Sequence, residues 1–139
     1  FRRVLFRSIK VTYSGNIKTT AAKGGSQITT ATDNSPESRT AGTTFTPVDM
    51  LVNSLGACML SMMGATAARK GIDIGRPTAT MTYDTDPATH RVTAVRVVFD
   101  VDGTNLSEAD RKVIMGAAKA CPVAASLSES IAKELVFNF

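Results

Sequence analysis

The 139-residue chain has few of the residues that most often carry chemistry, with two cysteines and one histidine. Two cysteines are too few for the disulfide framework of a small secreted protein, so the expected compartment is a reducing cytoplasm. One histidine and two cysteines at these spacings do not form a zinc site. The sequence also lacks a Gly-rich phosphate loop after a strand and the Ser/His/Asp order of a hydrolase. None of these chemistries is therefore expected.

Most of the excess positive charge lies in the first eight residues. The net charge is +4 and the pI is near 9.3, but without Arg2, Arg3 and Arg7 of the segment "FRRVLFRS" the net charge falls to +1. This segment, residues 1–8, shows no clear strand or helix pattern, and we interpret it as a cloning or sequence-assembly remnant. The remaining chain, 9–139, fits a single domain. Its charge gives no reason to expect a nucleic-acid partner.

No charged residue occurs from Met50 to Ala68, a stretch long enough to cross a bilayer. Polar and small residues such as Asn53, Ser54 and Thr66 dilute its hydrophobicity. We therefore interpret the stretch as a central helix that is buried on most sides, and we expect no membrane partner. No secretory signal is visible.

The pattern along the chain predicts an α+β fold, because helices are separated by antiparallel hairpins. The first long helix begins at Pro47, with Thr46 as N-cap and Asp49 close to a capping box, and it ends near Lys70 at Gly71. A polar, turn-rich loop precedes it at 33–47. The other predicted elements are strands at 9–13, 17–21, 26–32, 78–84 and 91–101, a helix capped by Ser107, a helix resuming over 123–134, and a closing strand at 135–139.

Cys58 lies in the middle of the predicted long helix. Two apolar stripes are expected to pack that helix on more than one side: Leu51, Leu55, Cys58, Met62 and Ala65 in one, and Val52, Met59 and Met63 in the other. Desolvation there would raise the pKa of the Cys58 thiol and make it inert unless a cation or a hydrogen-bond donor approaches. Alternatively, Cys58 is a small hydrophobic residue of the core.

Cys121 precedes Pro122, which is well suited to the first position of a helix. Cys121 would then be the N-cap, where the helix dipole and free amide groups lower the pKa of a thiol. The alternative is a core cysteine before a helix break. Two free cysteines in one small domain suit a thiol–disulfide cycle, provided that they meet in space.

The segments "TPVDMLVNSLGACMLSMM" (46–63) and "AKACPVAASL" (118–127) resemble the OsmC/Ohr family of cysteine peroxidases. The resemblance runs from "YSGNIK" (13–18) to the final "FNF", so that 9–139 would form one OsmC-like domain. The closing "VFNF" and the short loops are most similar to the uncharacterised OsmC-like branch. The resemblance implies an OsmC-like fold, with an antiparallel sheet, a long central helix, and an intertwined homodimer with active sites at the subunit interface.

The resemblance also implies an activity. Cys58 would attack the O–O bond of a hydroperoxide and become a sulfenic acid, and Cys121 would condense with it to a disulfide that a dithiol reductant reduces. No metal or organic cofactor is needed. Four methionines around Cys58, some lining an adaptable apolar pocket, would favour an organic hydroperoxide over hydrogen peroxide: Met50, Met59, Met62 and Met63.

Family members use an Arg and a Glu from the N-terminal half to activate the thiolate. Arg39, in the polar loop, and Asp49 are the matching candidates here, with a solvated surface arginine and a helix-capping acid as the alternatives. Asp49 and Cys58 are ~13 Å apart along a helix axis and on opposite faces, so Asp49 would reach a thiol only across the dimer. His90, in a hairpin turn, is expected to be a surface residue.

The residues alone are also compatible with a second function. The same scaffold would bind a small apolar or thiol ligand without turnover, and the cysteines would then be structural or vestigial. The distance between the two thiols separates these hypotheses, because a redox cycle requires disulfide range.

Overall fold

The computed structural model describes residues 8–24, 29–37, 42 and 44–139. The chain divides into two compact units, 1–51 and 52–139. Helix α3 (Pro47–Lys70) begins in the first unit and continues into the second, and it has the predicted bounds. Gly71 follows it with a φ of 66°, a left-handed conformation that suits glycine at a helix end.

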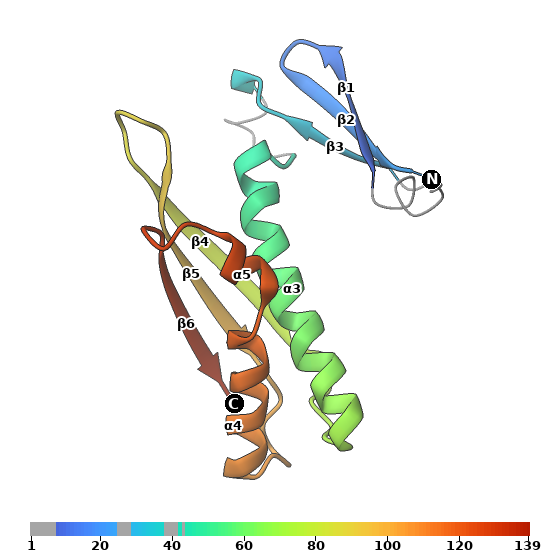
Figure 1. Ribbon diagram of the computed structural model, residues 1–139, viewed down its shortest axis with the longest axis vertical. Coiled ribbons are helices and arrows are strands. Elements are labelled where there is room, and N and C mark those ends of the chain that lie inside the picture. The colour runs from blue at the N-terminus through green and yellow to red at the C-terminus, as the bar shows by residue number, and fades with distance from the viewer. Residues whose placement is uncertain (1–7, 25–28, 38–41, 43) are drawn as a thin grey trace. The chain divides into compact units, whose positions relative to one another are not determined.

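The first unit contains an antiparallel sheet with strand order β1-β2-β3 (Figure 1). The strands are β1 (Ile9–Gly15), β2 (Lys18–Lys23) and β3 (Thr29–Asp33). The predicted hairpin is present, with Gly15, Asn16 and Ile17 all at positive φ in the turn. The beginning of the predicted strand 26–32 lies outside the described residues.

The second unit contains a sheet with strand order β4-β5-β6, made of β4 (Thr78–Thr85), β5 (Val92–Asp100) and β6 (Ala132–Asn138). Strands β4 and β5 form the predicted antiparallel hairpin, but β6 pairs parallel to β5. A parallel neighbour needs a crossover, and α4 (Glu108–Lys119) and α5 (Pro122–Ser126) supply it. The chain therefore has two small sheets, one of them mixed, where the sequence predicted antiparallel pairing.

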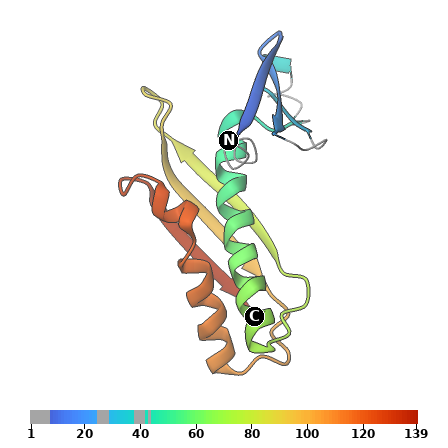
Figure 2. The ribbon, with the colours of Figure 1, turned by 45° about the vertical axis from the view of Figure 1, so that its right-hand side comes forward.

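The core of the second unit lies between its sheet and the helices α3 and α4, which Figure 2 shows on one side of the sheet. Fully buried side chains of this core come from three elements: Leu55, Met59 and Met63 of α3, Val97 and Phe99 of β5, and Ile114 and Ala118 of α4. Met81 of β4 packs so closely over Gly56 that a β carbon built there would lie 2.5 Å from its sulfur. These contacts hold α3 against the sheet.

Only part of the predicted burial of α3 is correct. The stripe of Val52, Met59 and Met63 is buried, whereas Leu51 is 42% exposed. Cys58 and Met62 are partly buried, and Ala65 is exposed. The apolar residues of α3 surround most of the helix, so periodicity alone did not show which side faces the sheet. By length and composition α3 would also pass for a membrane span, but the fully buried residues above support the core-helix interpretation.

The predicted helix over 123–134 is wrong beyond Ser126. Leu127 adopts an extended conformation, with a ψ of 151°. A turn follows, in which Ser128 Oγ accepts the Ser130 N–H at 3.3 Å, and Lys133 Nζ donates to the Ser128 and Ile131 carbonyls. From Ala132 onward the chain pairs with β5, and this long-range pairing overrides the helix-like local pattern.

Candidate thiol site

The two cysteines, both free, come from different elements of the second unit. Cys58 lies on α3 and is partly exposed, while Cys121 precedes α5 and is 1% exposed. The Cys58 thiol lies close enough to Cys121 to influence its pKa, and Cys58 packs against the buried cluster that contains Cys121. The structure therefore brings together the two residues that the sequence placed in one redox pair.

Local chain geometry holds Cys121 in place. Cys121 is the N-cap of α5, with Pro122 in the first turn, as predicted. Its Sγ accepts the Ala124 N–H at 3.4 Å, and its own N–H donates to the Ala118 carbonyl at 3.3 Å. The side chain belongs to the same buried cluster as Ile114 and Ala118 of α4. Cys121 is thus anchored on both sides, by the end of α4 and the start of α5.

The predicted lowering of the Cys121 pKa is wrong. Burial raises the pKa of the Cys121 thiol above its ordinary value, and the neighbouring Cys58 thiol raises it further. The backbone N–H groups of Ala124 and Val123 act in the expected direction and lower the pKa, but they do not outweigh burial. Cys121 therefore holds its proton more tightly than an ordinary thiol does.

Of the two predicted helpers, Arg39 lies outside the described residues. Asp49 belongs to the first unit, where its carboxylate accepts the Thr46 N–H and the Thr46 hydroxyl, both at 2.8 Å. In return, Thr46 Oγ1 accepts the Asp49 N–H at 3.1 Å. These reciprocal bonds form a capping box with Asp in place of Glu, which is the alternative role considered for Asp49.

His90 is exposed in the turn between β4 and β5, at a φ of 57°, and its N–H donates to the Asp86 carbonyl at 2.8 Å. In the described part of the chain, His, Cys, Asp and Glu side chains form no group of three or more that could hold a metal ion. Among the described residues, the groups shown to act on the Cys121 thiol are the Cys58 thiol and backbone N–H groups.

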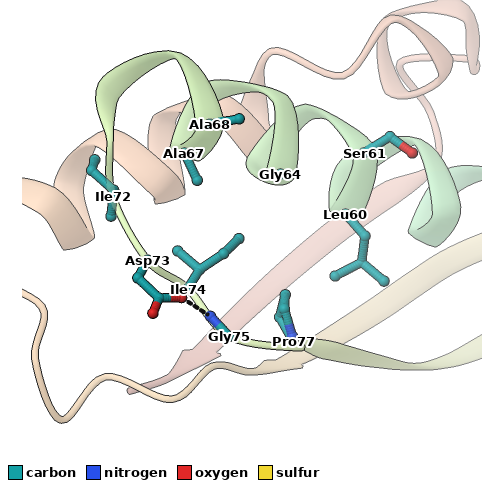
Figure 3. A pocket seen from close by; sticks show the side chains of 10 residues that line it. All are labelled: Leu60, Ser61, Gly64, Ala67, Ala68, Ile72, Asp73, Ile74, Gly75 and Pro77. Carbon is teal, nitrogen blue, oxygen red and sulfur yellow. Dashed lines mark hydrogen bonds between the residues drawn. The ribbon is translucent and has the colours of Figure 1, made fainter.

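An open groove of about 530 Å³ lies beside the C-terminal half of α3, against the segment 72–77. Figure 3 shows its lining, which comes from Leu60, Ser61, Gly64, Ala67 and Ala68 of α3 and from Ile72, Asp73, Ile74, Gly75 and Pro77. Neither cysteine lines it. None of the four methionines near Cys58 lines this groove, so the predicted methionine-lined pocket beside Cys58 stays a prediction. Sequence periodicity could not predict this groove, because residues 72–77 form an irregular segment after the helix.

The fold and the thiol pair define a small α+β protein with two free cysteines in contact, one accessible and one buried. The family model for OsmC-like proteins matches residues 40–135. The chain therefore belongs to the OsmC-like protein family.

Solved structures agree with this assignment. A putative osmotic stress induced and detoxification response protein from Psychrobacter arcticus is 31% identical, with 94% of each chain covered and a TM-score of 0.84. An OsmC-like protein from Mycoplasma pneumoniae is 17% identical, with 95% of each chain covered and a TM-score of 0.79. The organic hydroperoxide resistance protein OhrB of Bacillus subtilis is 18% identical over 94% of this chain and 98% of its own, with a TM-score of 0.66. A search of curated proteins found no match.

Proposed function

We propose that this protein is a thiol-dependent peroxidase that reduces organic hydroperoxides through Cys58, with Cys121 as the resolving cysteine. The contact between a partly exposed thiol and a buried thiol carries the proposal. A hydroperoxide reaches the exposed sulfur first, and the second sulfur is already adjacent to the product. Membership of a family in which some structural relatives are named organic hydroperoxide resistance proteins supports it further.

The proposed cycle has three steps. The Cys58 thiolate attacks one oxygen of the hydroperoxide, the O–O bond breaks, and the alcohol leaves after taking up a proton, so that Cys58 becomes a sulfenic acid. The sulfur of Cys121 then attacks Cys58 Sγ, and the S–O bond breaks. The departing hydroxide combines with the Cys121 proton as water. A dithiol finally reduces the disulfide and becomes a disulfide itself.

Intact mass and free-thiol counts test this cycle. Reduced protein is mixed with one equivalent of cumene hydroperoxide and compared with Cys58→Ser and Cys121→Ser. We expect rapid loss of both thiols and of two protons' mass in the wild type, and no loss in Cys58→Ser. Cys121→Ser should accumulate a sulfenic or over-oxidised species. Thiols that stay reduced for hours in the wild type would contradict the proposal.

We further propose that the active unit is a homodimer. In the first unit, the alternating residues Ile9, Val11 and Tyr13 of β1 are each at least 60% exposed and lie on one face of a three-stranded sheet. Such an exposed apolar face is unusual on a monomeric protein and is well suited to pack against a second copy of this chain. Light scattering after gel filtration should give a dimer mass for the wild type and a monomer for Val11→Lys. A monomeric wild type would contradict this part.

We expect the protein to act in a reducing cytoplasm. A dithiol reductant is required, because the cycle consumes one dithiol per peroxide. Arg39 is proposed to activate the Cys58 thiolate. The proposal for Asp49 is that it assists from the partner subunit while it caps its own helix.

The alternative, a protein that binds a small apolar ligand without turnover, rests on the groove beside α3. Its volume of about 530 Å³ is sufficient for a small molecule, and its lining combines apolar side chains such as Leu60 and Ile72 with polar groups such as Ser61 and Asp73. Tight binding of an apolar probe by a protein whose thiols do not respond to hydroperoxide would favour this alternative.

A further inference from the structure

The two sulfurs of the site differ in how accessible they are to the thiol of another molecule. Cys58 retains exposed surface on α3, one turn before Ser61, which is small and exposed. Cys121 is 1% exposed and belongs to the hydrophobic core of the second unit. An external reagent can therefore reach Cys58, whereas Cys121 is covered by protein.

The direction of thiol–disulfide exchange strengthens this difference. The attacking sulfur, the attacked sulfur and the leaving sulfur lie nearly in line, so an attack on Cys121 has to come from the side opposite Cys58. Protein fills the surroundings of Cys121, including the buried Ile114 and Ala118 of the same cluster. A reductant would have to enter the core to attack Cys121.

Burial makes Cys121 a weaker leaving group than an ordinary thiol, because it raises the pKa of this thiol, and two backbone N–H groups offset part of that effect. A sulfur that leaves as a thiolate departs faster when its negative charge is stabilised. The Ala124 N–H already donates to Cys121 Sγ at 3.4 Å, and the Val123 N–H contributes in the same direction. These N–H groups do not outweigh burial, so the preference for Cys121 as the leaving sulfur rests on access to Cys58 and not on the pKa of Cys121.

We propose that the reductant of the Cys58–Cys121 disulfide attacks Cys58, and that Cys121 is the leaving sulfur. The origin of that disulfide rests on the peroxidase function proposed above. One sulfur of a dithiol attacks Cys58 Sγ as a thiolate, a mixed disulfide forms there, and the bond to Cys121 breaks. Cys121 takes the electron pair and then a proton. The second thiolate of the reductant attacks the reductant's own sulfur in the mixed disulfide, which releases Cys58 as a thiolate and closes the reductant's disulfide.

Trapping the mixed disulfide tests the proposal. The intramolecular disulfide is prepared in one sample with cumene hydroperoxide and in another with diamide. Each sample is treated briefly with 2-mercaptoethanol, quenched with acid at a series of short times, and alkylated. Peptide mass spectrometry then locates the mercaptoethanol adduct. We expect the earliest adduct on Cys58, with alkylated Cys121, in roughly tenfold excess or more. Equal adducts, or an excess on Cys121, would overturn the inference.

The two oxidants separate this inference from the proposed function. A disulfide that forms with diamide and not with hydroperoxide would contradict the peroxidase proposal, and the adduct position would still decide the inference. Failure to form the disulfide with either oxidant would overturn both.

Single-cysteine variants provide a matched control. We expect Cys58 in Cys121→Ser to react with 5,5′-dithiobis(2-nitrobenzoate) roughly tenfold faster than Cys121 in Cys58→Ser. Both should react equally in guanidinium chloride, and circular dichroism should show that both are folded in buffer. Equal rates in folded variants would contradict the proposal. If one variant fails to fold, the adduct position in the wild type decides alone.

Discussion

Cys121 Sγ accepts the backbone N–H of Ala124 at 3.4 Å, so the side chain that contacts Cys58 is also the N-cap of α5. One residue thus links the candidate chemistry to the local stability of the crossover between β5 and β6. The two roles respond differently to substitution.

Replacing Cys121 with serine or with alanine should separate these roles. Serine keeps an acceptor for the Ala124 N–H, whereas alanine removes it, and loss of an N-cap lowers the free energy of unfolding by about 1 kcal/mol. We expect both variants to lose disulfide formation and Cys121→Ala to be the less stable in urea unfolding. Equal stability of the two variants would show that the sulfur does not cap α5.

Stability of the reduced protein should fall at alkaline pH. Because burial raises the pKa of the Cys121 thiol in the folded state, the folded protein holds this proton more tightly than the unfolded chain. That stabilisation is fully present below the ordinary thiol pKa of about 8.5 and is lost as the pH rises through the folded pKa. Urea midpoints between pH 7 and pH 10 measure the effect under reducing conditions. Cys121→Ser is the control and should show a smaller decline; identical slopes would contradict the expectation.

Oxidation should stabilise the fold. A Cys58–Cys121 disulfide closes a loop of about 60 residues, for which the chain-entropy model gives up to about 4 kcal/mol. We expect the Tm of the oxidised protein to exceed that of the reduced protein by at least about 5 °C. Calorimetry with and without a reductant measures the difference. A lower Tm on oxidation would mean that the bond strains the packing of α3 against α5.

Arg39 is expected to matter for the rate of Cys58 oxidation and not for folding. A guanidinium near a thiolate and a peroxide stabilises developing charge, and removing such a group lowers a rate by about 10²-fold. Stopped-flow thiol loss in Arg39→Ala, with Arg76→Ala as a surface control, measures this effect. An unchanged rate in Arg39→Ala would remove Arg39 from the site.

Variants of Asp49 require measurements of both stability and the rate of Cys58 oxidation, because Asp49 caps α3 independently of any role at the thiols. Asp49→Ala breaks the reciprocal bonds with Thr46 and should lower stability by about 1 kcal/mol. Asp49→Asn keeps an acceptor oxygen and removes the charge. A slower Cys58 oxidation in Asp49→Asn at near wild-type stability would indicate a catalytic contribution, and an unchanged rate would leave capping as its function.

Local signals in the sequence predicted the parts of the fold that local interactions determine. The start of α3 at Thr46 and the capping box of Ser107 and Asp110 depend on residues three positions apart, and both are present. The end of α3 at Gly71 likewise depends on one left-handed residue.

The features of the fold and of the site that the sequence did not predict depend on long-range interactions. The segment after Pro122 has a helix-like pattern, but pairing with β5 makes Ala132–Asn138 a strand. The net pKa shift of Cys121 depends on burial by elements far away in the chain, which outweighs the nearby amides. The contact between Cys58 and Cys121 was expected through family resemblance, and spacing alone did not indicate it.

The parallel pairing of β6 with β5 has a consequence for local unfolding. The hairpin β4–β5 forms between neighbouring segments, whereas β6 returns only after the crossover, and no residue of α5 itself is fully buried. Segments with few buried side chains open at a fraction of the global unfolding free energy. Opening of α5 alone would withdraw the Ala124 N–H from Cys121 Sγ, while the end of α4 keeps Cys121 in the core. Hydrogen exchange of the Ala124 amide therefore reports how often the Cys121 thiol loses this hydrogen bond in the native protein.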